Sequence, residues 1–404
     1  QLDKVETPSD GVVTGYGLIN GCPVYVYSQD AQVLGGSIGE MHARKIVNLY
    51  DLAIKTGVPV IGMIDCAGIR LQESTDALHA FGMIYKKQAE ASGVILQISA
   101  IFGNCGGGLS VFTTLTDFTL MEEKGQLFVN APNAIEGNRK EVLNSASAVF
   151  QSKEAGTVDF VGNETEVFEE IRKLTQIFPS NYKDQSKVID CVDDLNRLCE
   201  NISAGNGKEI LIQIADQNEF VELKKDYGND MAIGFIRLNG ETIGCIANKE
   251  ERISAQGAKK AASFVKLCDA FGIGILTVTD TVGFVAEIEQ EKELSQAIGA
   301  MTGAFVQATV PKVNVISKKA FGSAYVSMNS KSIGADFVYA WSDAKIGMME
   351  ADMAVKIMYP GANADVLKEK AKEYEELQSD VYTAARRGYV DTVIDPAETR
   401  KYVI

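Results

Sequence analysis

The sequence contains little histidine: His42 and His79 are the only two in 404 residues. A metal centre built from several histidines is therefore excluded, and we predict no metal site. Neither histidine lies near a convincing serine or cysteine nucleophile, so we expect no Ser-His or Cys-His hydrolase. Both fall within expected helices, where we assign them structural roles.

The sequence also lacks paired cysteines, because none of its seven cysteines has the C-x-x-C spacing. Their odd number and scattered positions predict reduced, mostly buried thiols and a cytoplasmic location. No run of apolar residues reaches the roughly 18 that a membrane span requires, so we expect none.

Positive charge is scarce. Lys and Arg total 39 against 54 Asp and Glu, which gives a net charge of −15. This balance argues against nucleic-acid or anionic-membrane binding, since both surfaces attract basic residues. The hydrophobic content of 46% and charged content of 23% are typical of a globular protein with a normal core.

An internal repeat is the strongest feature present. The turn Asn20-Gly21 recurs 219 residues later as Asn239-Gly240. Three more pairs follow in the same order at nearly the same offset: Asp65 with Asp280, Ala91 with Ala308, and Asp117 with Asp336. The period is far longer than the roughly 20–50 residues of solenoid repeats, so it indicates a duplicated domain. With a boundary at Ala204–Gly207, we predict domains over 1–205 and 206–404.

Local patterns alternate between strands and helices. After an Asn20-Gly21 hairpin, the first half predicts a helix over 39–56, a strand over 58–64, a helix over 76–92 and a strand over 94–101. Apolar strands separated by helices are typical of an α/β fold with a parallel sheet. We expect residues 140–205 to be mostly helical, and the second half to repeat the order and end with a helix over 365–378.

A glycine-rich segment, Gly103 to Gly108, follows the strand over 94–101 and precedes a short expected helix. Glycine allows close backbone approach, and free N–H groups at a helix start favour negative charge. These amides could form an oxyanion hole for a thioester enolate. The alternative is a tight turn without a ligand. No Lys-Ser/Thr follows, so the segment is not a Walker loop.

The second half repeats this setting at Lys319 to Tyr325, where Gly322, Ser323 and Ala324 follow a buried strand. Small residues in both copies favour two anion-stabilising turns. A third segment runs from Asp65 through Ala67 and Gly68 to Arg70. Arg70 could bind a phosphate or carboxylate, or pair with Glu73 on a solvated face.

A fourth segment contains Gly35 and Gly36 just before Ser37. Ser37 and Glu40 have the spacing of a capping box at a helix start. The structural interpretation suffices for this segment, and a ligand role is the alternative.

Together these motifs resemble the biotin-dependent acyl-CoA carboxyltransferases. That family includes the β subunit of propionyl-CoA carboxylase and the α subunits of glutaconyl-CoA and methylmalonyl-CoA decarboxylases. The markers span nearly the whole chain: Asp10–Gly15, Tyr27–Asp30, Gly35–Ser37, Gly103–Gly108, Leu115–Phe118, Phe264–Ala270, Ala308–Val313 and Lys319–Tyr325. The resemblance implies two tandem crotonase-like ββα-superhelix domains, in agreement with the duplication.

The resemblance also implies a mechanism. Acyl-CoA binds mainly to the N-terminal domain and biotin mainly to the C-terminal one, in a pocket that many members share between two subunits. The amides of Gly107 and Gly108 would hold the thioester oxygen, and those of Ser323 and Ala324 the biotin ureido oxygen. Carboxybiotin would release CO2, and the biotin anion would remove the α-proton to give an enolate that captures CO2. Decarboxylation reverses these steps. Further implied contacts to substrate are Gly35, Gly36, Ala67, Gly68, Arg70, Gly106, Gly322 and Val326.

No Met-Lys-Met biotin-attachment sequence occurs, so we expect biotin on a separate carrier protein. The other expected partners are biotin carboxylase or a membrane decarboxylase subunit, and further copies of the chain in a dimer or a hexamer. A non-catalytic scaffold subunit and a crotonase-type hydratase or isomerase are the alternatives. The hydratase would require paired carboxylates, and none stands out.

The sequence departs from the family pattern at four points, one of which is the stretch from Asp280 to Glu287 on the biotin side. Ser323 replaces a glycine but keeps its amide, and Val326 replaces an aspartate near the acyl group. The stretch from Lys249 to Ser254 is shorter than usual, either by deletion or because a loop is missing from the sequence. The acyl group and the direction of the reaction therefore stay open.

Overall fold

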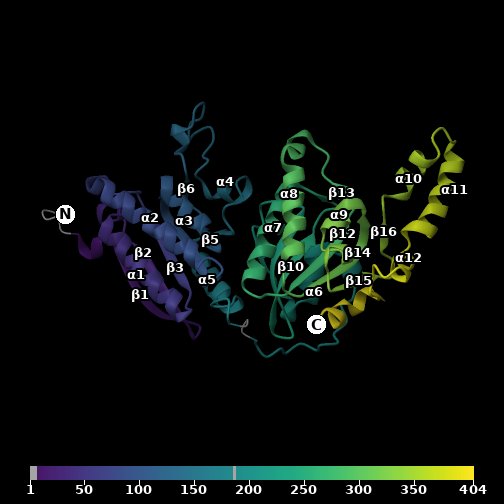
Figure 1. Ribbon diagram of the computed structural model, residues 1–404, viewed down its shortest axis with the longest axis horizontal. Coiled ribbons are helices and arrows are strands. Elements are labelled where there is room, and N and C mark those ends of the chain that lie inside the picture. The colour runs from purple at the N-terminus through teal and green to yellow at the C-terminus, as the bar shows by residue number, and fades with distance from the viewer. Residues whose placement is uncertain (1–6, 185–187) are drawn as a thin grey trace. The chain divides into compact units, whose positions relative to one another are not determined.

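The computed structural model describes residues 7–184 and 188–404. Contacts divide the chain into two compact units, Gln1–Lys187 and Val188–Ile404. Each unit contains a sheet flanked by helices (Figure 1). The division at 187 precedes the predicted boundary at 205 because Cys199 and Ile202 are buried in the core of the second unit.

The first unit is built on a sheet with the order β1-β2-β3-β4-β5-β7, and β6 lies beside β4. Its strands are β1 (Val12–Ile19), β2 (Cys22–Gln29), β3 (Val60–Cys66), β4 (Gln97–Gly106), β5 (Phe118–Glu122), β6 (Gln126–Phe128) and β7 (Phe160–Gly162). Its helices are α1 (Glu40–Thr56), α2 (Ser74–Ala91), α3 (Ser110–Thr114), α4 (Ala148–Lys153) and α5 (Glu164–Ile177), with a 3-10 turn η4 (Gly107–Leu109). The hairpin β1–β2 is antiparallel, and the strands from β2 onward pair in parallel.

The second unit has the order β8-β9-β10-β12-β14-β15-β17, and β16 lies beside β14. Its strands are β8 (Val221–Leu223), β9 (Met231–Leu238), β10 (Glu241–Asn248), β11 (Arg252–Ile253), β12 (Ile275–Thr281), β13 (Gly283–Phe284), β14 (Lys312–Phe321), β15 (Phe337–Trp341), β16 (Lys345–Gly347) and β17 (Thr392–Ile394). Its helices are α6 (Gly207–Ile214), α7 (Ala255–Ala270), α8 (Ile288–Gln307), α9 (Gly322–Ser327), α10 (Ala351–Met358), α11 (Ala364–Tyr374), α12 (Val381–Arg386) and α13 (Thr399–Val403).

The two units share one topology, which confirms the duplicated α/β fold. Strands β1 to β7 of the first unit correspond in order to β9, β10, β12, β14, β15, β16 and β17. The antiparallel hairpins match residue for residue, since Val12 pairs with Gln29 and Met231 with Asn248. In each unit an apolar helix face covers the hairpin: α1 packs on β1 and β2, and α7 packs on β9 and β10.

The units differ at one sheet edge. In the second unit β8 pairs with β9 and places Glu222 opposite Gly234. A Cβ on Gly234 would lie 2.1 Å from the carbonyl oxygen of Val221, so this glycine is required by the added strand. A Cβ on the equivalent Gly15 of β1 would have no heavy atom within 4 Å. Within the described part of the first unit, no strand pairs with this outer edge of β1.

Two expectations about the elements need correction. Strand β4 runs on to Gly106 instead of ending near 101, because Asn104, Cys105 and Gly106 pair with β6. The segment 140–205 is only partly helical: α4 and α5 form, but residues 188–201 contain neither helix nor strand. Carboxylates there bind nearby backbone N–H groups, as Asp194 does with Asn196, which favours turns over helix.

Three helix predictions agree closely with the structure, but the second half does not end with the last of these helices, because α12, β17 and α13 follow it. The helices expected over 39–56 and 76–92 are α1 and α2, and the one over 365–378 is α11 followed by a π-helical turn at Glu375–Ser379. In the part of the chain that is described, no helix has both the length and the apolar character needed to cross a bilayer.

Candidate functional site

A cavity of about 480 Å³ opens beside the glycine-rich turn of the first unit. It brings together Ala67 and Gly68, which follow β3, with Gly106, Gly107 and Gly108 at the end of β4. Its full lining is Cys66, Ala67, Gly68, Ile69, Leu71, Phe81, Asn104, Gly106, Gly107, Gly108, Leu109 and Phe128. Two of the four predicted segments therefore meet at one mostly apolar cavity.

The glycine-rich segment turns sharply at Gly107. Gly107 has a φ of +64°, a conformation that side chains disfavour, and it begins the short turn η4. The N–H groups of Gly107 and Gly108 occupy the first positions of that turn, where helical geometry supplies no acceptor. Their carbonyls are held internally, because Gly107 O accepts from Ser110 Oγ at 2.8 Å and Gly108 O accepts from the Tyr85 hydroxyl.

An aromatic cluster supports this turn from α2. The rings of Phe81 and Tyr85 lie 5.2 Å apart and both pack against Phe112. Burial raises the pKa of the Tyr85 phenol, which keeps this group a hydrogen-bond donor to Gly108. No sequence motif pointed to Phe81 and Tyr85. Their spacing of four residues on an expected helix was the available signal.

Gly35 and Gly36 lie behind the cavity and do not line it. The carbonyl of Gly35 accepts from the N–H of Ala67 at 2.8 Å, and a Cβ on Gly36 would lie 2.3 Å from the carbonyl oxygen of Asp65. Their position fits a role in allowing the backbones after β2 and β3 to approach. The predicted substrate contact of these two glycines is therefore not supported by the geometry.

The predicted capping box of Ser37 and Glu40 does not form. Gly39 is the N-cap of α1, and as a glycine it has no side chain that could cap the helix. The N–H of Glu40 instead donates to a carboxylate oxygen of Glu73 at 2.6 Å. A carboxylate from a distant segment thus replaces the local cap. The same carboxylate also forms an ion pair with Arg70.

Arg70 is buried away from the cavity. Its side chain has no exposed surface and forms ion pairs with Asp10 at 2.6 Å and Glu73 at 2.9 Å. It also donates to the carbonyl of Ser37 at 2.8 Å. Burial alone would raise the pKa of Glu73, but the N–H of Glu40 and the Arg70 guanidinium lower it overall. Arg70 ties three segments together, so this geometry favours a structural role over the predicted substrate contact.

Residues Gly35 to Gly39 also have the spacing of a G-x-S-x-G nucleophile motif, with Ser37 at its centre. Ser37 is buried, and its hydroxyl accepts from Arg70 Nε at 3.4 Å. The His42 ring faces Asp10 and Gln29 instead, and burial lowers its pKa to about 4. Among the described residues, the Ser37 hydroxyl therefore has no hydrogen bond to a histidine or a carboxylate that could act as its base.

The second unit repeats the turn after β14. Lys319, Ala320 and Phe321 pair with β16 as Asn104, Cys105 and Gly106 pair with β6. Gly322 is thus the counterpart of Gly107, and its φ of +62° matches. In this register Ser323 corresponds to Gly108 and Ala324 to Leu109. The amide pairs predicted in the two halves are therefore offset by one residue.

Ser323 is exposed and Ala324 is buried at the start of α9. Their N–H groups lie in the first helical turn, where the helix supplies no acceptor. Val326 follows one residue after Tyr325 and is 39% exposed, so its side chain is accessible to a ligand. Burial raises the pKa of the Tyr325 phenol to about 12.

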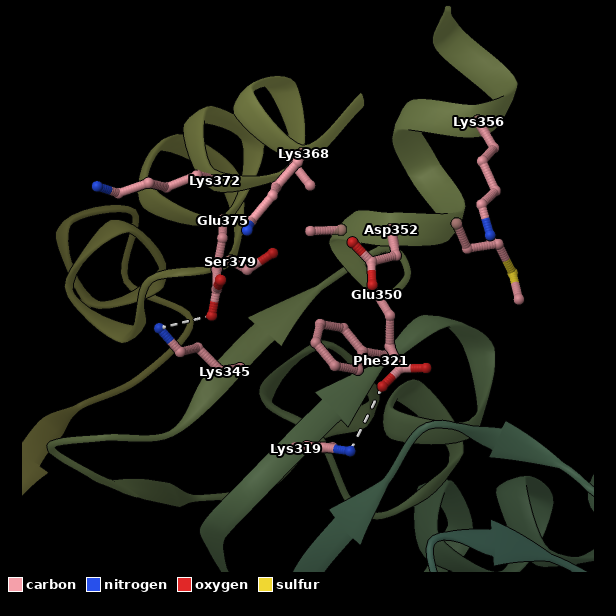
Figure 2. Close-up of a pocket in the computed structure, with 13 residues that line it drawn as sticks. Lys319, Phe321, Lys345, Glu350, Asp352, Lys356, Lys368, Lys372, Glu375 and Ser379 are labelled. Atoms are coloured by element: carbon pink, nitrogen blue, oxygen red, sulfur yellow. Dashed lines mark hydrogen bonds and ion pairs between the residues drawn. The ribbon is translucent and has the colours of Figure 1, made fainter. Parts of the chain in front are cut away.

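A second cavity of about 590 Å³ lies next to this turn, between β14, β16, α10 and α11 (Figure 2). Phe321, the residue before Gly322, lines it, but Gly322, Ser323 and Ala324 do not. Five lysines line this cavity: Lys319, Lys345, Lys356, Lys368 and Lys372. No sequence motif predicted this cavity, because its lining comes from five separate elements.

Comparison with known proteins agrees with the repeated fold and turn. The carboxyl transferase domain family matches residues 1–404, the whole chain. The chain belongs to this family. This confirms the expectation of a biotin-dependent acyl-CoA carboxyltransferase.

Individual relatives of this carboxyltransferase cover nearly all of it. The α subunit of methylmalonyl-CoA decarboxylase from Propionigenium modestum is 37% identical over 100% of the chain and 83% of its own length. The propionyl-CoA carboxylase β chain of Cereibacter sphaeroides is 39% identical over 98% of the chain and 81% of its own length.

Solved structures confirm the crotonase-like fold of the carboxyltransferase. The crystal structure of transcarboxylase 12S with methylmalonyl-coenzyme A and methylmalonic acid bound superposes with a TM-score of 0.94 at 33% identity. The match covers 99% of the chain and 82% of that protein. A long-chain acyl-CoA carboxylase at 22% identity has the same fold, with a TM-score of 0.82.

Proposed function

We propose that this carboxyltransferase moves a carboxyl group between biotin on a separate carrier protein and the α-carbon of a short-chain acyl-CoA. Relatives named for propionyl-CoA and methylmalonyl-CoA support this substrate class. The observation that carries the proposal is the repeated turn, since Gly107 and Gly322 adopt φ values of +64° and +62° at matching positions. Two turns that present backbone N–H groups can stabilise two oxygen anions.

In the first unit, the N–H groups of Gly107 and Gly108 hold the thioester oxygen. Loss of the α-proton, or of the α-carboxyl group in the reverse direction, leaves negative charge on this oxygen as an enolate. Donors held in place before the reaction stabilise that charge, and each is worth roughly 3 kcal/mol in the transition state. The cavity beside the turn, with Ala67, Gly68 and Phe128 in its lining, receives the acyl group and shields the enolate from water.

In the second unit, the N–H groups of Ser323 and Ala324 hold the ureido oxygen of biotin. The site fits this group because Ser323 is exposed at the start of α9, where a ring on a carrier arm has access. Biotin, when bound, supplies the nitrogen that carries the carboxyl group. The matching register raises a second possibility for the acyl side, in which Gly108 and Leu109 are the donors equivalent to Ser323 and Ala324.

This assignment makes the first domain the acyl-CoA side and the second the biotin side. The partners are a biotin carrier protein and either biotin carboxylase or a membrane decarboxylase subunit, and the location is cytoplasmic. The related transcarboxylase 12S assembles as a hexamer, and we propose a homo-oligomer for this chain. Val326, accessible beside the second turn, is a candidate for setting the acyl preference.

Carboxyl exchange tests the proposal. The protein is incubated with unlabelled methylmalonyl-CoA, propionyl-CoA that carries a radiolabel in its propionyl group, and free biotin or a biotinylated carrier. We expect label to exchange between the two thioesters only when biotin is present. A folded protein that exchanges no label with any acyl-CoA would instead be a scaffold subunit. Hydration of an enoyl-CoA without biotin would identify a hydratase.

A further inference from the structure

The lysine-lined cavity of the second unit has the size of a ligand site. Its volume of about 590 Å³ lies within the roughly 300–1,000 Å³ typical of small-molecule sites. Its walls come from strands β14 and β16 and from helices α10 and α11 (Figure 2). Apolar Phe321, Ala351, Met353 and Ala371 form part of the lining. The cavity is therefore neither a flat charged surface nor a site for a single ion.

Carboxylates inside the cavity neutralise only part of its positive charge. The lining contains Glu350, Asp352 and Glu375. Glu350 lies 3.4 Å from the Lys319 ammonium, which also pairs with Glu251 at 3.0 Å. Glu375 pairs with Lys345 at 3.2 Å. These two lysines are therefore satisfied by the protein itself, as the dashed lines of Figure 2 indicate.

Two other lysines have no such partner. Lys356 on α10 and Lys368 on α11 form no ion pair within residues 7–184 and 188–404. Figure 2 shows Lys368 extending toward the centre of the cavity, whereas Lys372 points away from it. Lys372 lies 4.0 Å from Glu376, and both side chains are largely exposed. Asp352 is thus the lining carboxylate left to balance Lys356 and Lys368.

The cluster is not a consequence of overall composition. The chain carries a net charge of −15, so its average field repels anions. Lysines on the outer side of α11 behave as expected for a solvated helix face, since Lys370 pairs with Glu373 at 2.6 Å. Lys356 and Lys368 instead line a cavity from two different helices. Two ammonium groups that line one cavity without an ion-pair partner favour an anionic ligand with more than one charge.

We propose that this cavity binds a phosphate-bearing ligand of nucleotide size, with Lys356 and Lys368 as its phosphate contacts. Lysine is a common phosphate-binding residue because its compact ammonium group can meet any phosphate oxygen. The apolar lining beside Phe321 provides a surface for the uncharged part of the ligand. The phosphates can belong to coenzyme A itself or to a separate nucleotide, and both present the same chemistry to the two lysines.

Isothermal titration of the full chain tests the site with four probes: pyrophosphate, ADP, coenzyme A and pantetheine, which lacks the nucleotide phosphates. The test variant is the double substitution Lys356→Glu with Lys368→Glu. We expect it to weaken phosphate-probe binding at least about tenfold, because each lysine donates a charge-assisted hydrogen bond. The milder Lys356→Gln with Lys368→Gln variant should weaken binding less. Added salt should weaken wild-type binding.

A matched control is Lys266→Glu. Lys266 is exposed on α7 and forms no ion pair among the described residues, and it does not line the cavity. We expect this substitution, which makes half the charge change of the double variant, to leave binding unaltered. The double variants should keep the wild-type circular dichroism, since both lysines are exposed.

The outcomes separate the two sources of phosphate. Weaker coenzyme A binding with unchanged pantetheine binding assigns the cavity to the substrate's phosphates. Weaker ADP binding with unchanged coenzyme A binding assigns it to a separate nucleotide. Wild-type protein that binds no phosphate probe, or a double variant that binds all of them as well as wild type, would overturn the proposal. None of these results depends on carboxyl exchange, so the proposed function and this site can fail separately.

Discussion

Asp280 accepts a hydrogen bond from the backbone N–H of Lys319 at 3.1 Å. Asp65 makes the equivalent bond with the N–H of Asn104 at 3.0 Å. In each unit a carboxylate at the end of one strand thus holds the neighbouring strand three residues before the left-handed glycine. In the first unit a Cβ on Gly103 would lie 2.1 Å from the Asp65 carboxylate, so a side chain there would displace that carboxylate.

Replacement of Asp280 by alanine should disturb the second turn while leaving the fold intact. We expect carboxyl exchange to fall about tenfold, and the free energy of unfolding to fall by about 1 kcal/mol, the value of one hydrogen bond. Asp280→Asn keeps an acceptor for the Lys319 N–H and should retain most activity. Equal loss in the two variants would show that the charge, and not the bond to Lys319, is what matters.

Substitution by proline removes the amide of Ser323. Proline is tolerated in the first turn of a helix, where its missing N–H has no helical acceptor. Gly107 does not allow this test, because its φ of +64° is incompatible with proline. We expect Ser323→Pro to lower carboxyl exchange about 100-fold or more, as for loss of one oxyanion donor. Ser323→Ala keeps the N–H and should remain within about twofold of wild type. Full activity in the proline variant would remove this amide from the mechanism.

The two equivalent edge glycines should respond differently to alanine. Gly234→Ala places a Cβ 2.1 Å from Val221 O, and overpacking of this kind costs about 1–3 kcal/mol. Gly15→Ala meets nothing within 4 Å and should change stability by less than about 0.5 kcal/mol. Thermal unfolding midpoints of the two variants measure the difference. Equal midpoints would contradict the close approach of β8 to β9.

Asp117 should make stability depend on pH. Burial raises the pKa of its carboxyl group to about 7 from 3.8, opposed by the N–H of Gln97 and assisted by the charge of Asp159. Between about pH 4 and 7 the folded state then holds more protons than the unfolded state, so this group lowers stability as the pH rises. The effect is complete above about pH 7.

Asp117→Asn should remove this dependence, since an amide oxygen can still accept from Gln97. We expect the variant to gain stability relative to wild type as the pH rises from about 4 to about 8, as measured by urea midpoints across that interval. A stability difference between the two proteins that does not change with pH would mean that the Asp117 carboxyl has the same pKa in the folded and unfolded states.

Arg70→Met tests whether Arg70 is structural. The substitution leaves Asp10 and Glu73 without their buried partner, which should destabilise the protein by about 3 kcal/mol. Because Arg70 does not line the cavity beside Gly107, the KM for acyl-CoA should stay within about twofold at a temperature where the variant is folded. A large rise in KM with unchanged stability would instead support the predicted substrate contact.

Much of the fold could be predicted from the sequence because it follows from local patterns. Apolar runs and helical spacing located α1 and α2, and the Asn-Gly turns located both hairpins. The repeat identified the duplication, since equivalent backbones need equivalent residues at their turns. Gly107 and Gly322 could be singled out for the same reason: only glycine readily adopts a φ near +60°.

The roles of particular side chains could not be predicted in this way. Arg70 has the chemistry to bind an anion, but its partner Asp10 lies 60 residues away in the sequence. Gly35 and Gly36 have the freedom to approach a ligand, but the end of β3 and Ala67 after it fill the space beside them. The lysine cavity collects Lys319 and Lys368 from elements that have no local pattern in common.

The sequence by itself determined the duplicated α/β fold, the family and the two glycine turns, because these depend on short-range backbone preferences and on spacing along the chain. Only the tertiary structure decided which residues of one segment line a cavity and which form ion pairs within the protein. Burial and partner choice arise from the packing of segments that are distant in sequence, and no local pattern encodes them.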